Sequence, residues 1–207
     1  MTPGTSGGRS SDDFLAALDR ELEASIARLE DSRFLRGLAD PSRSRALYVA
    51  YLREAYHFVR LTSSFTPLAA RRLDPRFLEL RRWILQHSAE ELGHETLALR
   101  DLEVLGLPRE DVERSEPLPG TIAWVSFFHY HVAIENPFSA LGVLYFLEGM
   151  AKALAPGATK LIVTALGPNE KAAVSFFREH GTLDADHVAQ QRRELGRDCR
   201  APEDQAA

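Results

Sequence analysis

The stretch His180-Gly181-Thr182-Leu183-Asp184-Ala185-Asp186-His187 lies near the end of the chain, in a segment predicted to be helical. In a helix, residues spaced i, i+4 and i+7 lie on one face, with neighbouring Cβ atoms about 5–6 Å apart. His180, Asp184 and His187 have this spacing. Two imidazoles and a carboxylate on one helical face are typical ligands of a metal ion.

A second stretch repeats these ligand types at the same spacing. His87, Glu91 and His94 also stand at i, i+4 and i+7, so four of the seven histidines fall in two stripes with an acid at each centre. An alternative is that Glu91 and Asp184 are ordinary exposed helix acids, since another acid lies close to each. Apolar residues around both stripes argue against it, because buried imidazoles and carboxylates without partners are costly. These flanking residues are Trp83, Ile84 and Leu97 for the first stripe and Val174, Phe176, Phe177 and Leu183 for the second.

A third acid stands inside an apolar run. Glu148 lies in Leu144-Tyr145-Phe146-Leu147-Glu148-Gly149-Met150. Carboxylates are rarely buried unless they are paired or coordinate a metal, so we expect Glu148 to be a further ligand. His57, in Tyr56-His57-Phe58-Val59-Arg60, poses the same question more weakly. It is a ligand, a residue that supports one, or a substrate contact.

The ligand types restrict the choice of metal. Nitrogen and carboxylate ligands without thiolate suit Fe, Mn or Zn. A structural zinc site would more often contain cysteine, and Cys199 is the single cysteine of the chain. The number of candidate ligands exceeds the needs of one ion and suits two, as in helical-bundle dimetal proteins. We therefore expect two Fe(II) ions per chain, with Mn or Zn as alternatives.

The remainder of the chain predicts an all-α fold in one domain. The 207 residues suggest one domain, and a hydrophobic content of 44% is ample for a core. No segment alternates apolar and polar residues, with enrichment in β-branched ones, over a length that would suggest a strand. Apolar residues recur at helical spacing, with Pro and Gly between segments, over about 12–40, 42–73, 74–105, 121–134, 137–154, 158–166 and 168–196. We expect a single bundle of about seven helices over 12–199, with a disordered tail at 1–11 and a frayed tail at 200–207.

Charge and hydropathy exclude several classes of protein. The formal net charge of −5 and the lack of a Lys/Arg run argue against a nucleic-acid partner. One cysteine permits no intramolecular disulfide. The first residues lack the apolar core of a secretory signal, and no apolar run approaches the ~18 residues that span a bilayer. We expect a soluble cytoplasmic protein without a membrane partner.

These motifs resemble the haem-oxygenase-like diiron oxidases and oxygenases, often labelled iron-containing redox enzymes. The resemblance extends from about Tyr48 to Gln191 and implies a seven-helix bundle with the cofactor between helices. By position, the family's ligands match His94, Glu148, His180, Asp184 and His187. The matching stretches are 56–60, 87–94 followed by 101–106, 141–149 and 180–187.

One ligand position departs from the family pattern. Some members place a Glu seven residues before the histidine that matches His94, where this chain has His87. Others place it three residues before, where this chain has Glu91. The departure leaves open one iron only, a different metal, or two ions with an extra nitrogen ligand.

The same fold also hosts haem oxygenases, thiaminase-like hydrolases and a cofactorless quinone-forming oxidase. The thiaminase-like branch uses a cysteine in the pocket, whereas Cys199 lies at the end of the chain, which is expected to be polar and frayed from Arg197 onward. Haem oxygenases take a histidine from the first helix, and the first expected helix contains none. Both activities are therefore disfavoured.

The expected function is an O₂-activating non-haem iron oxidase or oxygenase that acts on an amino-acid-like, fatty-acid or natural-product molecule, in a homodimer as among relatives. One alternative is a single-metal or cofactorless oxidase whose histidines act as bases. Another is a non-catalytic helical metal-binding protein. In the expected oxidase or oxygenase, Arg60 would bind a substrate carboxylate, and Tyr56, Tyr145 and His131 would line the pocket. A helical Arg more often forms a salt bridge, however, and a buried Tyr more often belongs to the core.

Overall fold

The computed structural model describes residues 9–207, and for residues 182–186 it describes the helical backbone alone. Within these residues it contains ten α-helices, one π-helix and no strand. The all-α prediction is confirmed, and the expected number of about seven helices is too low. The elements are α1 Ser11–Glu30, α2 Arg33–Leu38, α3 Pro41–Arg72, α4 Leu78–Glu90, α5 Glu95–Val104, α6 Arg109–Glu113, α7 Pro119–Tyr130, η1 His131–Glu135, α8 Ser139–Ala165, α9 Ser175–Asp198 and α10 Pro202–Gln205.

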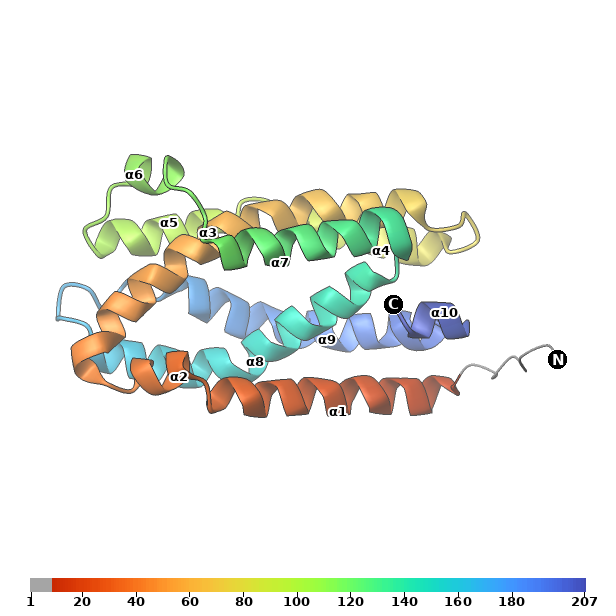
Figure 1. Ribbon diagram of the computed structural model, residues 1–207, viewed down its shortest axis with the longest axis horizontal. Coiled ribbons are helices and arrows are strands. Elements are labelled where there is room, and N and C mark those ends of the chain that lie inside the picture. Colours follow the sequence, from red (N-terminus) through yellow and green to blue (C-terminus); the bar gives the residue numbers. More distant parts are fainter. Residues whose placement is uncertain (1–8) are drawn as a thin grey trace.

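The long helices run roughly along the long axis of an elongated bundle (Figure 1). α8 packs along α9, and α3 packs against α4, α5 and α8. α7 lies across the outside of α3, and α1 lies against α8 and α9 at the opposite side. The site described below is formed where α4, α5, α8 and α9 meet.

Side chains at helix starts explain several boundaries. The Ser10 hydroxyl accepts a hydrogen bond from the Asp13 N–H at the start of α1. Asp40 caps α3 in the same way through the N–H of Ser42, and Pro41 occupies the first turn. Proline suits that turn because its missing N–H would have no helical partner there.

α8 continues where the sequence predicts a break. Pro156 and Gly157 lie inside this helix, which extends to Ala165. A proline in a helix interior costs about 3 kcal/mol. Packing offsets this cost, because Ala155, Ala158 and Ile162 on the neighbouring turns are buried.

Two groups of buried apolar residues hold the site in place. Tyr48 and Leu52 of α3 pack in one cluster with Leu99 and Leu102 of α5. A second cluster joins α4, through Leu80 and Ile84, to α8, through Leu141 and Leu144. The helices that carry the candidate ligands are therefore fixed by well-packed cores on both sides of the site.

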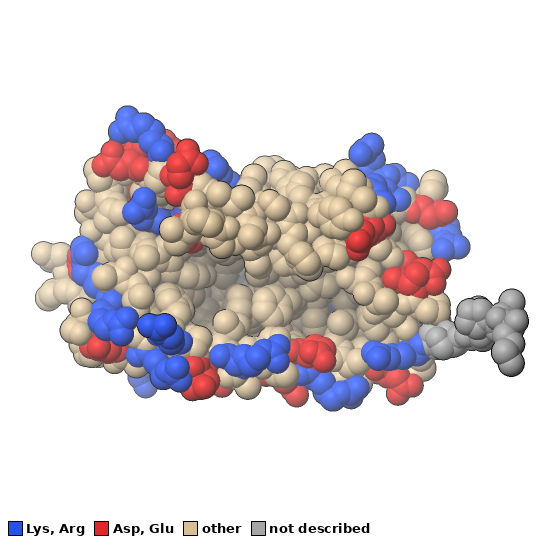
Figure 2. Space-filling view, viewed as in Figure 1, with Lys and Arg blue, Asp and Glu red and all other residues tan. Residues whose placement is uncertain are grey.

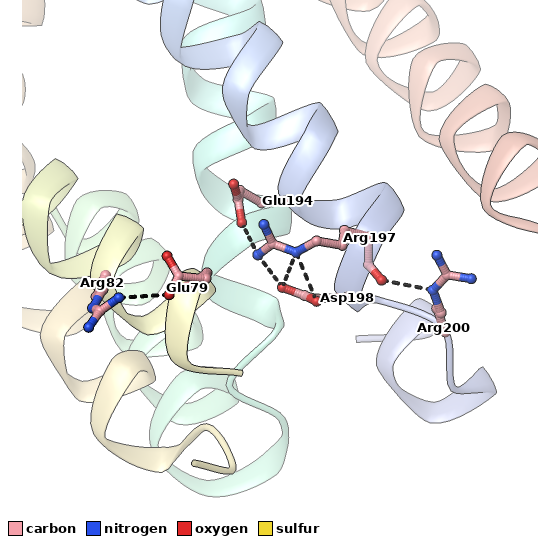
Figure 3. Close-up of polar contacts among 6 residues, drawn as sticks. All are labelled: Glu79, Arg82, Glu194, Arg197, Asp198 and Arg200. Carbon is pink, nitrogen blue, oxygen red and sulfur yellow. Dashed lines mark hydrogen bonds and ion pairs between the residues drawn. The ribbon is translucent and has the colours of Figure 1, made fainter. Parts of the chain in front are cut away.

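The two described ends of the chain meet. The Gln205 amide donates to the Arg9 carbonyl, and the Arg9 N–H donates to the Gln205 side-chain oxygen. Residues 200–207, expected to form a frayed tail, thus contain α10 and contact Arg9, just before α1. At the end of α9, Arg197 contacts Glu194 and Asp198 (Figure 3).

Among the described residues, no helix combines the length and hydropathy needed to cross a bilayer.

Candidate metal centre

The first predicted stripe does not lie on one helix. α4 ends at Glu90 and α5 begins at Glu95, and the turn between them contains Gly93 with φ +91°. Glycine adopts this conformation without the steric cost that a Cβ would bring. The expectation of one helix over 74–105 is therefore wrong. The turn separates His87 from His94 and brings them into two different groups.

The first group lies between α4 and α9. His87, Glu90 and His187 each offer a ligand atom, and these atoms lie within 4.8 Å of one another. Glu148 of α8 adjoins them, because its Oε1 lies 3.2 Å from His87 Nε2 and 3.9 Å from His187 Nδ1. We call this group position one.

The second group lies at the α4–α5 turn. Glu91, His94 and His180 also offer ligand atoms within 4.8 Å of one another. His94 Nδ1 lies 3.1 Å from Glu91 Oε2. The Nδ1–H of His180 donates to the Phe176 carbonyl at 2.8 Å, which leaves the lone pair of His180 on Nε2. We call this group position two.

Unsatisfied buried nitrogens test whether a metal fits. His87 is only 2% exposed, yet neither of its ring nitrogens forms a hydrogen bond with a described residue. The buried Nδ1 of His187 likewise forms no hydrogen bond with a described residue. Buried polar atoms without partners are costly, and a metal ion would remove the cost. Each position offers two imidazoles and at least one carboxylate, which includes the ligand set of many non-haem Fe(II) oxygenases, so the residues fit iron.

The ionisation states of these residues also suit a cation. Burial lowers the pKa of His87 to about 4. Burial likewise lowers the pKa of His180. Burial alone would raise the pKa of Glu91, but the hydrogen bond with His94 and the nearby imidazoles hold this pKa below its usual value. Near neutral pH these groups are neutral imidazoles and a carboxylate, the forms that bind metals.

Not all predicted ligands are equally described. Glu148 is buried on α8 and faces His87, as expected for an acid inside an apolar run. The Asp184 side chain lies outside the described residues, although its backbone belongs to α9 between His180 and His187.

Asp101 positions α9, the helix that carries His180 and His187. It is 1% exposed on α5 and accepts hydrogen bonds from the N–H groups of Ser175 and Phe176 at 3.0 and 2.9 Å. The hydroxyls of Ser175 and Tyr48 also donate to it. The Asp101 carboxylate therefore accepts from N–H groups that have no helical partner in the first turn of α9, next to the turn that carries His180. Sequence reasoning placed Asp101 in a family motif but gave it no role.

An apolar cavity of about 320 Å³ leads to both positions. Its acidic and imidazole lining residues are His87, Glu91, Glu148 and His180. No Lys or Arg is among its described lining residues, and most of the wall comes from Leu, Ala, Phe, Val and Met side chains of α1, α2, α3, α8 and α9. Figure 2 shows one face of the molecule hollowed between α7 and α1, with charged side chains gathered mostly along the rims.

Three residues predicted near the site, His57, Arg60 and Tyr56, lie elsewhere on α3. The Ser115 hydroxyl donates to the Val112 carbonyl and accepts from His57 Nε2 at 3.0 Å. His57 thus ties α3 to the α6–α7 connection. The Arg60 guanidinium is exposed and stacks on the Tyr56 ring, 5.2 Å from its centroid. None of these three side chains is among the residues that line the cavity.

The other two predicted pocket residues also have different partners. The Tyr145 hydroxyl donates to Asp19, which in turn pairs with Arg192. Tyr145 therefore joins α8 to α1. His131 lies in η1, with Nδ1 3.0 Å from Glu135 Oε2, and lines a separate cavity of about 220 Å³.

Sequence reasoning missed Glu90 as a member of the site. Glu90 and Glu91 are consecutive, so their side chains leave the helix about 100° apart and face different partners. Glu90 Oε2 lies 3.4 Å from His187 Nε2, whereas Glu91 contacts His94. The available signal was the pair of adjacent acids two residues before Gly93.

The geometry can be compared with known proteins. A model of the family described as "Iron-containing redox enzyme" matches residues 49–207. A crystal structure from Shewanella denitrificans OS217, described as a domain of unknown function with a haem oxygenase-like fold, has a TM-score of 0.80 at 28% identity, covering 92% of this chain and 82% of that chain. A TenA homologue from P. horikoshii OT3 has a TM-score of 0.69 at 15% identity, covering 93% and 88%. A comparison with curated proteins gives no match.

Proposed function

Because this chain belongs to the family of iron-containing redox enzymes, we propose that it is a non-haem oxidase or oxygenase that uses O₂ and holds two Fe(II) ions. Position two would hold one ion through Glu91, His94 and His180. Position one would hold the other through His87 and His187, together with Glu148. Asp184, which stands between His180 and His187 in the sequence, would be a further ligand. Bound Fe(II) would supply the binding and reduction of O₂.

The observation that carries this proposal is the pairing of two such ligand groups with one apolar cavity. His87, Glu91, Glu148 and His180 all line that cavity. A substrate in it would therefore lie next to both positions. The cavity wall would exclude water from the reaction, and the buried imidazoles would remain neutral.

The cavity also indicates the substrate class. A cavity of about 320 Å³ lies at the lower end of the roughly 300–1,000 Å³ range of small-molecule pockets. A charged group far from the metal positions would lie unpaired among apolar side chains, at a cost of several kcal/mol. We therefore favour a small, largely apolar substrate whose polar group faces the metal positions, and disfavour an amino-acid-like one.

Oxygen consumption tests the proposal. Protein loaded anaerobically with Fe(II) should show an optical change on exposure to O₂ and take up O₂ beyond the slow oxidation of free Fe(II). Glu91→Ala should abolish both responses, while Glu103→Ala, at an exposed site on α5, should leave them unchanged. A wild-type protein that binds iron but does not respond to O₂ would contradict the redox assignment and leave a metal-binding protein.

A further inference from the structure

We propose that Glu90 is a positioning residue that fixes the tautomer of His187 and turns its Nδ1 toward the interior of position one. The use of that nitrogen as a ligand rests on the proposed function. The tautomer itself is a property of the metal-free protein, so it can be tested separately.

His187 lies between two carboxylates. Its Nε2 is 3.4 Å from Glu90 Oε2, and its Nδ1 is 3.9 Å from Glu148 Oε1. A neutral imidazole has one N–H and one lone pair, so only one nitrogen can donate. Since Glu90 Oε2 is the nearer of the two carboxylate oxygens, the proton is assigned to Nε2. The lone pair then lies on Nδ1, which is buried and forms no hydrogen bond with a described residue.

Glu90 is itself held in position. The Gln86 side-chain amide, one turn earlier on α4, donates to Glu90 Oε1 at 2.9 Å. Oε1 is thus engaged by Gln86, and Oε2 faces His187. A carboxylate that accepts the second N–H of a ligating histidine fixes the orientation of the ring and raises its basicity.

His180 provides a built-in contrast on the same helix. Its Nδ1–H donates to the Phe176 carbonyl, which leaves Nε2 for the site. The two histidines of α9 are therefore expected in opposite tautomers, Nδ1–H for His180 and Nε2–H for His187.

The alternative role of Glu90 is that of a direct ligand, since its carboxylate lies within 4.8 Å of ligand atoms of His87 and His187. In that case Nε2 of His187 would have to carry the lone pair. Two observations favour the positioning role. The Glu90 side chain is 46% exposed, whereas that of Glu148 is 8% exposed. The Nδ1 side of His187 is also the side on which Glu148 approaches His87 Nε2.

Nuclear magnetic resonance can read the tautomers directly. Long-range ¹H–¹⁵N correlation on metal-free protein at about pH 8, above the ordinary histidine pKa of about 6.5, should show Nε2–H for His187 and Nδ1–H for His180. Glu90→Ala should convert His187 to a mixture of tautomers and leave His180 unchanged. Glu90→Gln should keep Nε2–H, because the amide oxygen still accepts. The matched control is Glu79→Ala, since Glu79 is an exposed α4 acid paired with Arg82 (Figure 3) and should have no effect.

Metal titration gives the second readout. Loss of such an orienting partner typically weakens metal affinity 10–100-fold. Glu90→Ala should weaken the binding of one of two Co(II) ions by about this factor, and Glu90→Gln should stay within a few-fold of wild type.

An unchanged His187 tautomer in Glu90→Ala, or an Nδ1–H tautomer of His187 in wild type, would overturn the inference. Equal loss of one ion in Glu90→Gln and Glu90→Ala would assign Glu90 as a direct ligand instead. A wild-type protein that binds no metal but shows the expected tautomers would contradict the proposed function and still support the orientation of His187 by Glu90.

Discussion

At the scale of single residues, burial keeps several imidazoles neutral, and this has a measurable consequence at His57. This side chain is 2% exposed and donates from Nε2 to Ser115. Burial is the largest cause that lowers its pKa, and the Arg60 charge adds to it. His57 is not among the residues assigned to the metal positions, so its effect can be separated from metal binding.

We expect the stability of the metal-free protein to fall as the pH drops below about 6.5, the ordinary histidine pKa. The folded-state pKa of His57 lies below the unfolded value, so the unfolded chain binds more protons in the interval between them. Stability is therefore present above that interval and is lost through it as the pH falls. Urea unfolding at several pH values should show a weaker dependence for His57→Gln. An identical slope in both proteins would contradict the assignment.

At the scale of elements, the turn between α4 and α5 decides which acids and histidines meet. A continuous helix would have kept His87, Glu91 and His94 on one face, as the spacing predicts. The turn instead directs Glu91 and His94 toward His180, and leaves His87 to His187. Gly93 makes this turn possible at φ +91°.

Gly93→Ala should destabilise the fold by about 1–2 kcal/mol and weaken metal binding at position two. A built Cβ there meets no atom within 4 Å, so the cost comes from the backbone conformation rather than from a clash. Gly142→Ala is the matched control, because its Cβ also meets nothing but its backbone is helical. That variant should be neutral or stabilised by up to about 1 kcal/mol. Equal effects at both positions, measured by chemical denaturation, would contradict the role of the turn.

Physical reasons separate what the sequence could predict from what it could not. The spacing of His180 and His187 on α9 and the burial of Glu148 follow from local periodicity and from the cost of burying an acid, and both agree with the structure. The α4–α5 turn depends on tertiary contacts, because one glycine in a helical pattern is usually tolerated. The continuity of α8 through Pro156 likewise depends on packing against other helices.

Partner choice is the least predictable from sequence. His57, Arg60 and Tyr145 stand in motifs that suggest a pocket, yet their partners are Ser115, Tyr56 and Asp19. Asp19 lies 126 positions from Tyr145 along the chain, whereas the Tyr56 ring lies one helical turn from Arg60. No local pattern identifies them.

At the scale of the whole molecule, the cavity links the surface to both metal positions. Ala151 lines it, whereas Ala153 on the same helix is exposed and does not. Ala151→Phe should fill part of the cavity and abolish the binding of 1-octanol, measured by calorimetry, while metal content is retained. Ala153→Phe should leave both properties unchanged. Undiminished 1-octanol binding in Ala151→Phe would place the apolar site elsewhere.

The expected homodimer also belongs to this scale and stays a prediction. Sedimentation equilibrium measures it directly, since one chain has a mass of 23.1 kDa and a dimer twice that mass.

The central claim is that the chain holds two metal ions in two separate ligand groups. The most direct measurement is iron per chain after anaerobic loading with Fe(II) and removal of free metal. The control is His129→Ala, because His129 lies on α7 and belongs to neither ligand group. We expect two irons in wild type and in this control, and one iron in each of His87→Ala and His94→Ala. One iron or none in wild type, or two irons in both of the latter variants, would contradict the account.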